Sequence, residues 1–102
     1  MIRAEKLETM LTDGADSASL RLALGSKYLE TGEIQRALEH LSVAVSLDPD
    51  YSAAWKLLGR AQTEAGLTDD AVETYRKGIE VATRRGDVQA AREMKVFFKR
   101  LG

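Results

Sequence analysis

The fold is decided by residues 55–75, which read WKLLGRAQTEAGLTDDAVETY. Helix-forming residues dominate both sides of Gly66, and the apolar positions among them recur at helical spacing. Glycine adopts positive φ at low cost, so it can end one helix and reverse the chain before the next. The stretch therefore predicts two antiparallel helices joined by a short turn.

The same arrangement is found 34 residues earlier, where a shift of that length places Leu24 and Gly25 on Leu58 and Gly59. The shift also aligns four other pairs of residues, namely Gly32 with Gly66, Ala37 with Ala71, Leu41 with Tyr75 and Ala44 with Gly78. A single offset that matches so many positions identifies an internal repeat. Gly25 and Gly59 lie inside helices, where glycine costs about 1 kcal/mol against alanine, so we expect helices to pack closely there.

These positions resemble the tetratricopeptide repeat family, whose unit of about 34 residues follows the pattern W-x2-L-G-x2-Y, then A-x3-F, then P. The second unit fits the pattern through Trp55, Leu58-Gly59 and Ala71-x3-Tyr75, and the first through Leu24-Gly25-x2-Tyr28, Ala37-x3-Leu41 and Pro49. The residues that depart from it are Arg21, Gln62, Gly78 and Thr83. The resemblance implies an all-α fold, a right-handed superhelical stack of antiparallel helix pairs.

Glycines and the single proline divide the whole chain into six helical segments. The dividing points predict helices near 2–12, 17–30, 33–46, 51–65, 68–84 and 87–101. The side chains expected to cap first turns are Asp16 or Ser17, Asp50 and Thr68, while Asp69 and Asp70 add negative charge at a helix start.

The repeat also predicts the domain organisation. One helical pair cannot bury its apolar face alone, so arrays of this kind need about three stacked units with polar outer surfaces. We expect one domain over 1–102, divided into an N-terminal capping helix (1–17), repeat one (18–51), repeat two (52–85) and a C-terminal capping helix (86–102). We also expect a monomer.

Composition excludes several classes of function. The chain has no cysteine and one histidine, so we predict neither an enzyme nor a bound metal or cofactor. Its formal net charge of −1 argues against nucleic-acid binding through a global positive field. The start of the chain has no apolar run fit for a signal or membrane segment, which predicts a cytoplasmic protein that does not bind membranes.

Aromatic and titratable side chains are given structural roles. Trp55, Tyr28 and Tyr75 lie at helical spacing and are expected in the core. His40 has neither a second histidine nor a cysteine with which to form a metal site. We therefore expect His40 to be either solvated or packed, not a metal ligand.

The resemblance implies a scaffold without chemistry of its own, which binds a peptide segment of another protein in a concave face lined by the first helix of each pair. The candidate binding residues on these helices are Ser19, Leu22, Ser26, Leu29, Lys56, Arg60 and Thr63, with Glu30, Ala53 and Glu64 beside them, and Lys95 on the last helix. The family's carboxylate clamp uses lysine, arginine and asparagine side chains. The chain has no asparagine, so a complete clamp is not expected.

Charge is distributed unevenly along the chain. Residues 1–51 carry five basic and nine acidic residues, a net charge of −4, whereas residues 52–102 carry ten and seven, a net charge of +3. Lys56 and Arg60 lie four residues apart on one helix face, so we expect a partner that presents acidic residues or a free C-terminal carboxylate. The alternatives are a structural subunit that self-associates or docks permanently in a larger assembly, and a nucleic-acid accessory that uses the basic C-terminal end.

Overall fold

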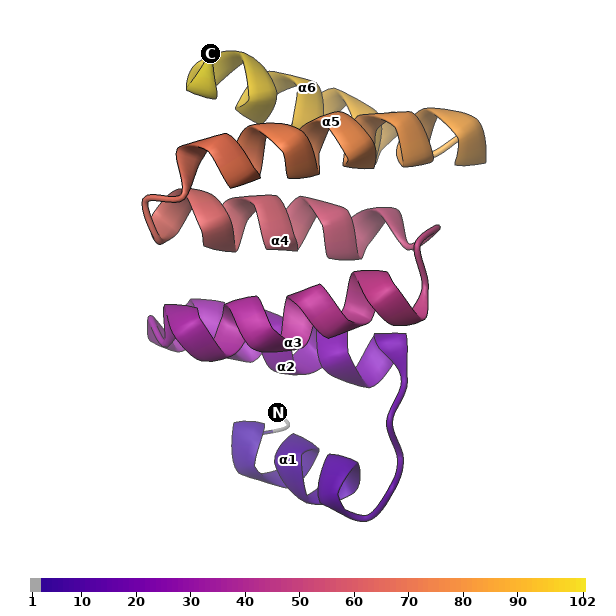
Figure 1. Cartoon of the computed structure of the whole chain (residues 1–102). Helices are drawn as coiled ribbons and strands as arrows, with labels where there is room; N and C mark the ends of the chain where they lie inside the picture. The colour runs from indigo at the N-terminus through magenta and orange to yellow at the C-terminus, as the bar shows by residue number, and fades with distance from the viewer. Residues whose placement is uncertain (1–2) are drawn as a thin grey trace.

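The computed structural model describes residues 3–102, and all regular structure in this range is helical (Figure 1). The six predicted helices are confirmed, and their ends lie within two residues of the expected ones. They are α1 (Ala4–Thr12), α2 (Ala18–Thr31), α3 (Ile34–Leu47), α4 (Ser52–Glu64), α5 (Thr68–Arg85) and α6 (Val88–Leu101). Residue 2, where the sequence predicts the first helix to begin, lies outside the described residues. Within residues 3–102, none of the helices combines the length and the apolar character needed to cross a lipid bilayer.

Most of the predicted helix ends are confirmed. Gly32, Gly66 and Gly86 have φ between 76° and 78°, the left-handed conformation that closes a helix and turns the chain. Ser17 caps α2, because its Oγ accepts a hydrogen bond at 3.1 Å from the backbone N–H three residues later. Asp69 and Asp70 lie in the first turn of α5, at the positive end of the helix dipole.

Two of the predicted caps are wrong. The cap positions of α4 and α5 are held by Tyr51 and Leu67, and neither side chain accepts a capping hydrogen bond. Asp50 lies one residue too early, and its carboxylate forms an ion pair with Arg84 instead. Thr68 lies one residue too late, since it is already the first helical residue of α5.

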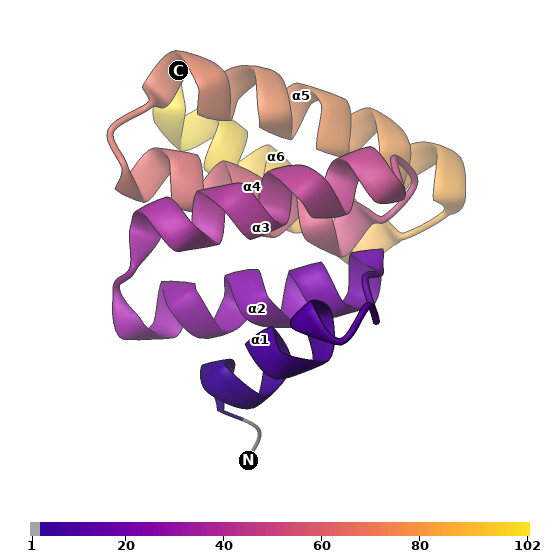
Figure 2. The same cartoon turned by 60° about the horizontal axis from the view of Figure 1, so that its bottom comes forward.

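Each helix packs against its neighbour in the chain, so the molecule is an extended stack with its termini at opposite ends (Figure 1, Figure 2). In addition, α2 approaches α4 and α4 approaches α6, whereas no Cα atom of α3 lies within 8 Å of a Cα atom of α5. In a curved stack, helices on the inner side approach one another and helices on the outer side separate. The concave side is therefore formed by α2, α4 and α6.

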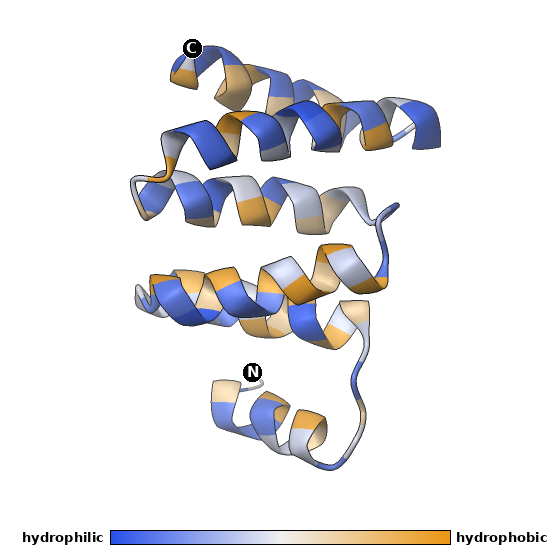
Figure 3. Cartoon of the chain, in the orientation of Figure 1, coloured by the Kyte–Doolittle hydropathy of each residue, from blue (hydrophilic) through white to orange (hydrophobic). Residues whose placement is uncertain are grey.

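The core lies between the helices, whose apolar positions recur as stripes among the polar ones (Figure 3). Close helix packing at the two interior glycines is confirmed. A Cβ atom on Gly25 would overlap the side chain of Leu41, and one on Gly59 would lie 2.5 Å from Cε1 of Tyr75. Glycine has no Cβ atom, and this lets α3 pack closely on α2 and α5 pack closely on α4.

The predicted core positions hold for two of the three aromatic residues. Tyr28 and Tyr75 are almost fully buried, but Trp55 is only half-buried. The indole packs against the core near Gly78, while its Nε1 donates a hydrogen bond to the carbonyl oxygen of Pro49 at 2.8 Å. The expectation that Trp55 is a core residue is therefore wrong, because its N–H reaches out to the turn that precedes α4.

Candidate functional site

The concave side is centred on one face of α4. Lys56, Arg60 and Thr63 are separated by four and three residues, so they project from the same side of this helix. The side chain of Lys56 is half-buried, and the other two are exposed. The predicted residues of α2 that reach the surface are Ser19, Leu22, Ser26 and Glu30.

The positive charge of α4 is largely offset by neighbouring acids. Lys56 Nζ donates a hydrogen bond to Oε2 of Glu93 on α6 at 3.2 Å. Arg60 Nε lies 3.5 Å from Oε1 of Glu64, one turn further along the same helix. The concave side is therefore less positive at Lys56 than the charge count of the sequence indicates. Sequence reasoning missed this ion pair because its partners lie 37 residues apart on different helices.

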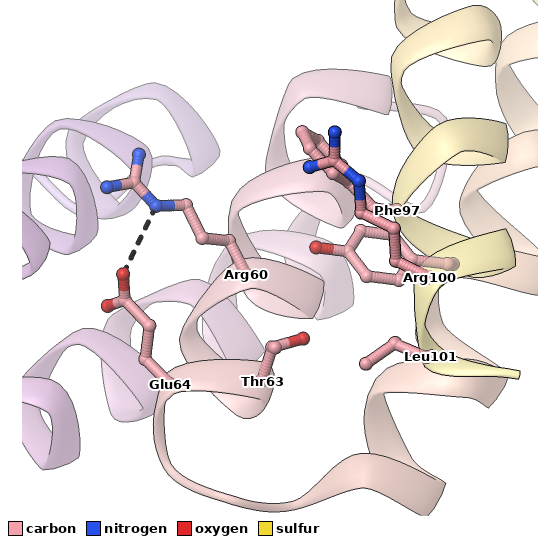
Figure 4. A pocket seen from close by; sticks show the side chains of 7 residues that line it. Arg60, Thr63, Glu64, Phe97, Arg100 and Leu101 are labelled. Carbon is pink, nitrogen blue, oxygen red and sulfur yellow. Dashed lines mark ion pairs between the residues drawn. The ribbon is translucent and has the colours of Figure 1, made fainter.

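A pocket of about 400 Å³ opens on the concave side between α4, α5 and α6 (Figure 4). Its lining residues are Arg60, Thr63, Glu64, Tyr75, Phe97, Arg100 and Leu101. The Arg100 side chain of α6 stands beside Phe97, whereas the guanidinium group of Arg60 on α4 points toward Glu64 at the edge of the pocket. A pocket of this kind fits an apolar side chain that has an anionic group next to it.

The two arginine side chains of this pocket differ in whether an acidic side chain is paired with them, and the phenol of Tyr75 is buried. Arg60 shares its charge with Glu64, whereas Arg100 has no acidic side chain within ion-pair distance among residues 3–102. Burial raises the pKa of Tyr75, against the opposing effects of the Thr63 hydroxyl and the Arg60 charge. The phenol is therefore neutral near pH 7, and Arg100 is the cation most available to an anion.

Four residues that line the pocket were not among the candidate binding residues from sequence, namely Tyr75, Phe97, Arg100 and Leu101. Phe97 and Leu101 follow the buried stripe of the last helix, and both are half-buried at the rim of the core. Arg100 is exposed. Basic residues such as Lys99 and Arg100 are common in the last turn of a helix, so only the approach of α6 to α4 distinguishes Arg100.

Two predicted site residues lie elsewhere. Leu29 is only 7% exposed and belongs to the core cluster that contains Leu7 and Leu58, so it cannot line the groove. Lys95 is exposed, but it follows Glu93 by two residues and therefore points about 200° away from it around α6. Because Glu93 faces Lys56, Lys95 faces away from the concave side. Placing these two residues in the groove was wrong.

A second polar constellation lies at the opposite end of the stack. His40 of α3 is only 7% exposed, and its ring stacks on Tyr28 with centroids 5.6 Å apart. Its Nδ1 lies 3.1 Å from Nη1 of Arg21, and its Nε2 lies 3.0 Å from Oε1 of Glu8 on α1. A guanidinium only donates, so Nδ1 is the acceptor and Nε2–H donates to the carboxylate.

The remaining groups of this network are also paired. The Tyr28 hydroxyl donates a hydrogen bond to Glu8 at 2.8 Å. Burial is the largest cause that raises the pKa of the Tyr28 phenol, and this hydrogen bond is the second. Arg21 donates two hydrogen bonds to Asp16, at 2.9 and 3.0 Å, which lower the pKa of that carboxyl. The network joins α1, α2 and α3, and its polar groups satisfy one another. It holds α1 in place and offers no free group for chemistry.

The described part of the chain contains no group of three or more histidine or acidic side chains placed to hold a metal ion.

Comparison with known proteins gives results that agree with the repeat in the sequence. A family model described as tetratricopeptide repeat matches residues 28–94. A curated TPR repeat-containing protein of Pseudomonas aeruginosa is 47% identical over 97 residues, which cover 95% of this chain and 92% of that protein.

Two further similarities extend this result. The solution structure of a protein from Bordetella parapertussis has a TM-score of 0.84 and 40% identity, over 99% of this chain and 88% of that one. A heat-shock protein cognate co-chaperone of Aspergillus fumigatus is 37% identical over 59 residues, which cover 58% of this chain and 17% of that protein.

Proposed function

This chain belongs to the tetratricopeptide repeat family, and we propose that it is a non-catalytic adaptor which binds a peptide segment of a partner protein on its concave side. One relative carries the name of a co-chaperone, which supports a protein as the partner. The observation that carries the proposal is the pocket between α4, α5 and α6, where two arginine side chains stand beside an apolar surface.

The pocket favours a segment that is both apolar and anionic. An apolar side chain of the partner packs on Phe97 and Leu101, and a neighbouring carboxylate accepts hydrogen bonds from Arg100 and Arg60. The carboxylate belongs either to an acidic residue or to the C-terminus of the partner. The part of the partner segment that precedes this residue lies along α4 and α2, next to Lys56 and the exposed positions of α2.

Exposed ion pairs of this kind contribute only about 0.2–1 kcal/mol each, so we expect modest affinity that falls as salt increases. The shallow α2 half of the groove adds apolar contact through Leu22, which is half-buried. Most of the discrimination between peptides should therefore arise at the pocket and not along the groove.

The test is a selection of peptides from a library that displays free C-termini, followed by affinity measurements on the selected peptides. Replacing Arg60 and Arg100 by alanine should weaken binding by about tenfold if both side chains pair with the carboxylate. Arg85→Ala is the matched control, since that side chain is exposed in the last turn of α5, outside the pocket. Equal affinity of the double variant and the control variant would contradict the proposal.

The structural-subunit alternative is favoured by a different observation, which is the exposure of large apolar side chains on α6. A permanently docked subunit should oligomerise or aggregate when it is purified alone. An adaptor should stay monomeric, so light scattering on the pure protein separates the two functions.

A further inference from the structure

Among the described helices, α6 differs from α2 and α4 in how its faces are covered. α3 covers one face of α2 and α5 covers the same face of α4, but no described helix covers that face of α6. The correspondence is seen in the buried residues Leu24, Leu58 and Met94, one from each of these three helices. The next residue is glycine in α2 and α4, and it is Lys95 in α6.

The lysine changes what can pack on this face. Gly25 and Gly59 leave room for Leu41 and Tyr75, which enter the space that a Cβ atom would occupy. Lys95 fills that space with an exposed ammonium group, so a helix cannot pack there through a large apolar side chain. A carboxylate at the same position would pair with the ammonium group.

The uncovered face combines positive charge with apolar surface. Two hollows of about 230 and 400 Å³ meet at Lys95. The first is lined by Ala82, Thr83, Gly86, Val88, Ala91 and Arg92, and the second by Val96, Phe98 and Lys99. Val88 is 61% exposed and Val96 is 48% exposed, which are high values for valine in a folded protein.

The charge on this face is of one sign. Arg92, Lys95 and Lys99 are separated by three and four residues, so they form a line along one side of α6. None of them lies within ion-pair distance of an acid in residues 3–102. Glu93 is the only acidic residue of α6, and it pairs with Lys56 on the concave side. A helix end that only needs solubility would mix the two signs.

We propose that this face of α6 binds an acidic amphipathic helix of a partner protein, in the place that α3 and α5 take on α2 and α4. The apolar stripe of the bound helix packs over Val88, Ala91 and Phe98. Its carboxylates, spaced by three or four residues, pair with the line of cations. The surface is separate from the pocket between α4, α5 and α6, so the protein can hold two segments at once.

A second copy of the chain fits this face less well. Symmetric pairing of two α6 helices would place the three cations of one copy against those of the other, and like charges across an interface are costly. The exposed side of α1 carries Arg3 and Lys6 beside Glu5, so it presents no acidic stripe either. An acidic helix from another protein is therefore the occupant that the charges select.

The probe for the experiment is a synthetic amphipathic peptide as long as α5, 18 residues. It carries leucine and alanine on one face and glutamate on both flanks, and it is acetylated and amidated so that it has no free carboxyl terminus. A second peptide has glutamine in place of every glutamate. Fluorescence anisotropy should show that the glutamate peptide binds about tenfold more tightly than the glutamine peptide at low salt, with amide NMR shifts at Val88, Lys95 and Val96.

The decisive variant is Lys95→Glu with Lys99→Glu, since both side chains are exposed and the fold should tolerate the change. It should weaken binding of the glutamate peptide by about tenfold. The control, Lys6→Glu with Lys77→Glu, makes the same change of net charge on α1 and α5 and should leave binding unchanged. Because the probe lacks a carboxyl terminus, this result does not depend on peptide binding in the concave groove.

Several outcomes would overturn the proposal. These are equal binding of both peptides, equal affinity of the two double variants, amide shifts confined to the concave side, and binding to vesicles of anionic lipid without binding to the peptide. A dimer in sedimentation experiments that dissociates when Lys95 and Lys99 are reversed would assign the face to a second copy instead.

Discussion

The imidazole Nε2 of His40 lies 3.0 Å from Oε1 of Glu8, a residue 32 positions earlier in the chain. This contact reaches across from α3 to α1, a helix that otherwise packs only on α2. Leu7 is the only buried residue of α1. The polar contact therefore carries much of the attachment of the first helix.

Replacing Glu8 by alanine should loosen α1. The change leaves the Tyr28 hydroxyl and the His40 ring without their acceptor in a largely buried site, which costs about 1–3 kcal/mol of the free energy of unfolding. Hydrogen exchange should accelerate at the amides of α1 before it does so elsewhere. Glu5→Ala is the control, because Glu5 lies exposed on the same helix. Similar exchange in both variants would show that the network does not anchor α1.

A methyl group at Gly59 should disrupt the contact between α4 and α5. The new Cβ would meet the ring of Tyr75 at 2.5 Å, and this ring is 2% exposed and enclosed by the core. Overpacking of this kind costs about 1–3 kcal/mol, although alanine is the better helix former. Chemical denaturation of Gly59→Ala measures the loss. Higher stability of the variant would mean that the two helices lie further apart than described.

Met94→Ala should show how strongly α6 is held. Its side chain is fully buried against Gly78, so truncation should lower the free energy of unfolding by about 2–5 kcal/mol. Val96→Ala removes two methyl groups from the exposed side of the same helix and should change stability by about 0.5 kcal/mol at most. Equal denaturation midpoints for the two variants would mean that α6 is rotated from the described position.

Stability should fall at alkaline pH. Burial raises the pKa of Tyr28 and of Tyr75 above the ordinary value of 10.0. The stabilisation that corresponds to these shifts is fully present below pH 10 and is lost as the pH rises through the folded-state pKa values. Unfolding measured from neutral pH upward should therefore show a decline that begins near pH 10. The double variant Tyr28→Phe with Tyr75→Phe should be less stable at neutral pH and should show a flatter decline.

Sequence alone predicts which residues form helices and which of them pair along the chain. Helix formation depends on hydrogen bonds between residues four apart, and turns depend on the φ preference of single residues, so Gly32, Gly66 and Gly86 reveal the helix ends locally. The offset of 34 residues aligns Leu41 with Tyr75 and predicts close helix packing at the interior glycines, and the structure shows that these two side chains make that contact.

The pairing of side chains between helices was decided only by the tertiary structure. From Leu24 to Leu58 the offset is 34 residues, but from Leu58 to Met94 it is 36, because α5 is four residues longer than α3 and the turn after it is two residues shorter. Two residues correspond to about 200° of helix rotation, so the 34-residue repeat does not predict which residues of α6 face α4. The helical period determines which residues of one helix share a face, but it does not determine which face meets the neighbouring helix. How one axis is rotated against the next depends on the packing of the whole stack, which is why Lys56 meets Glu93 and Glu8 meets His40.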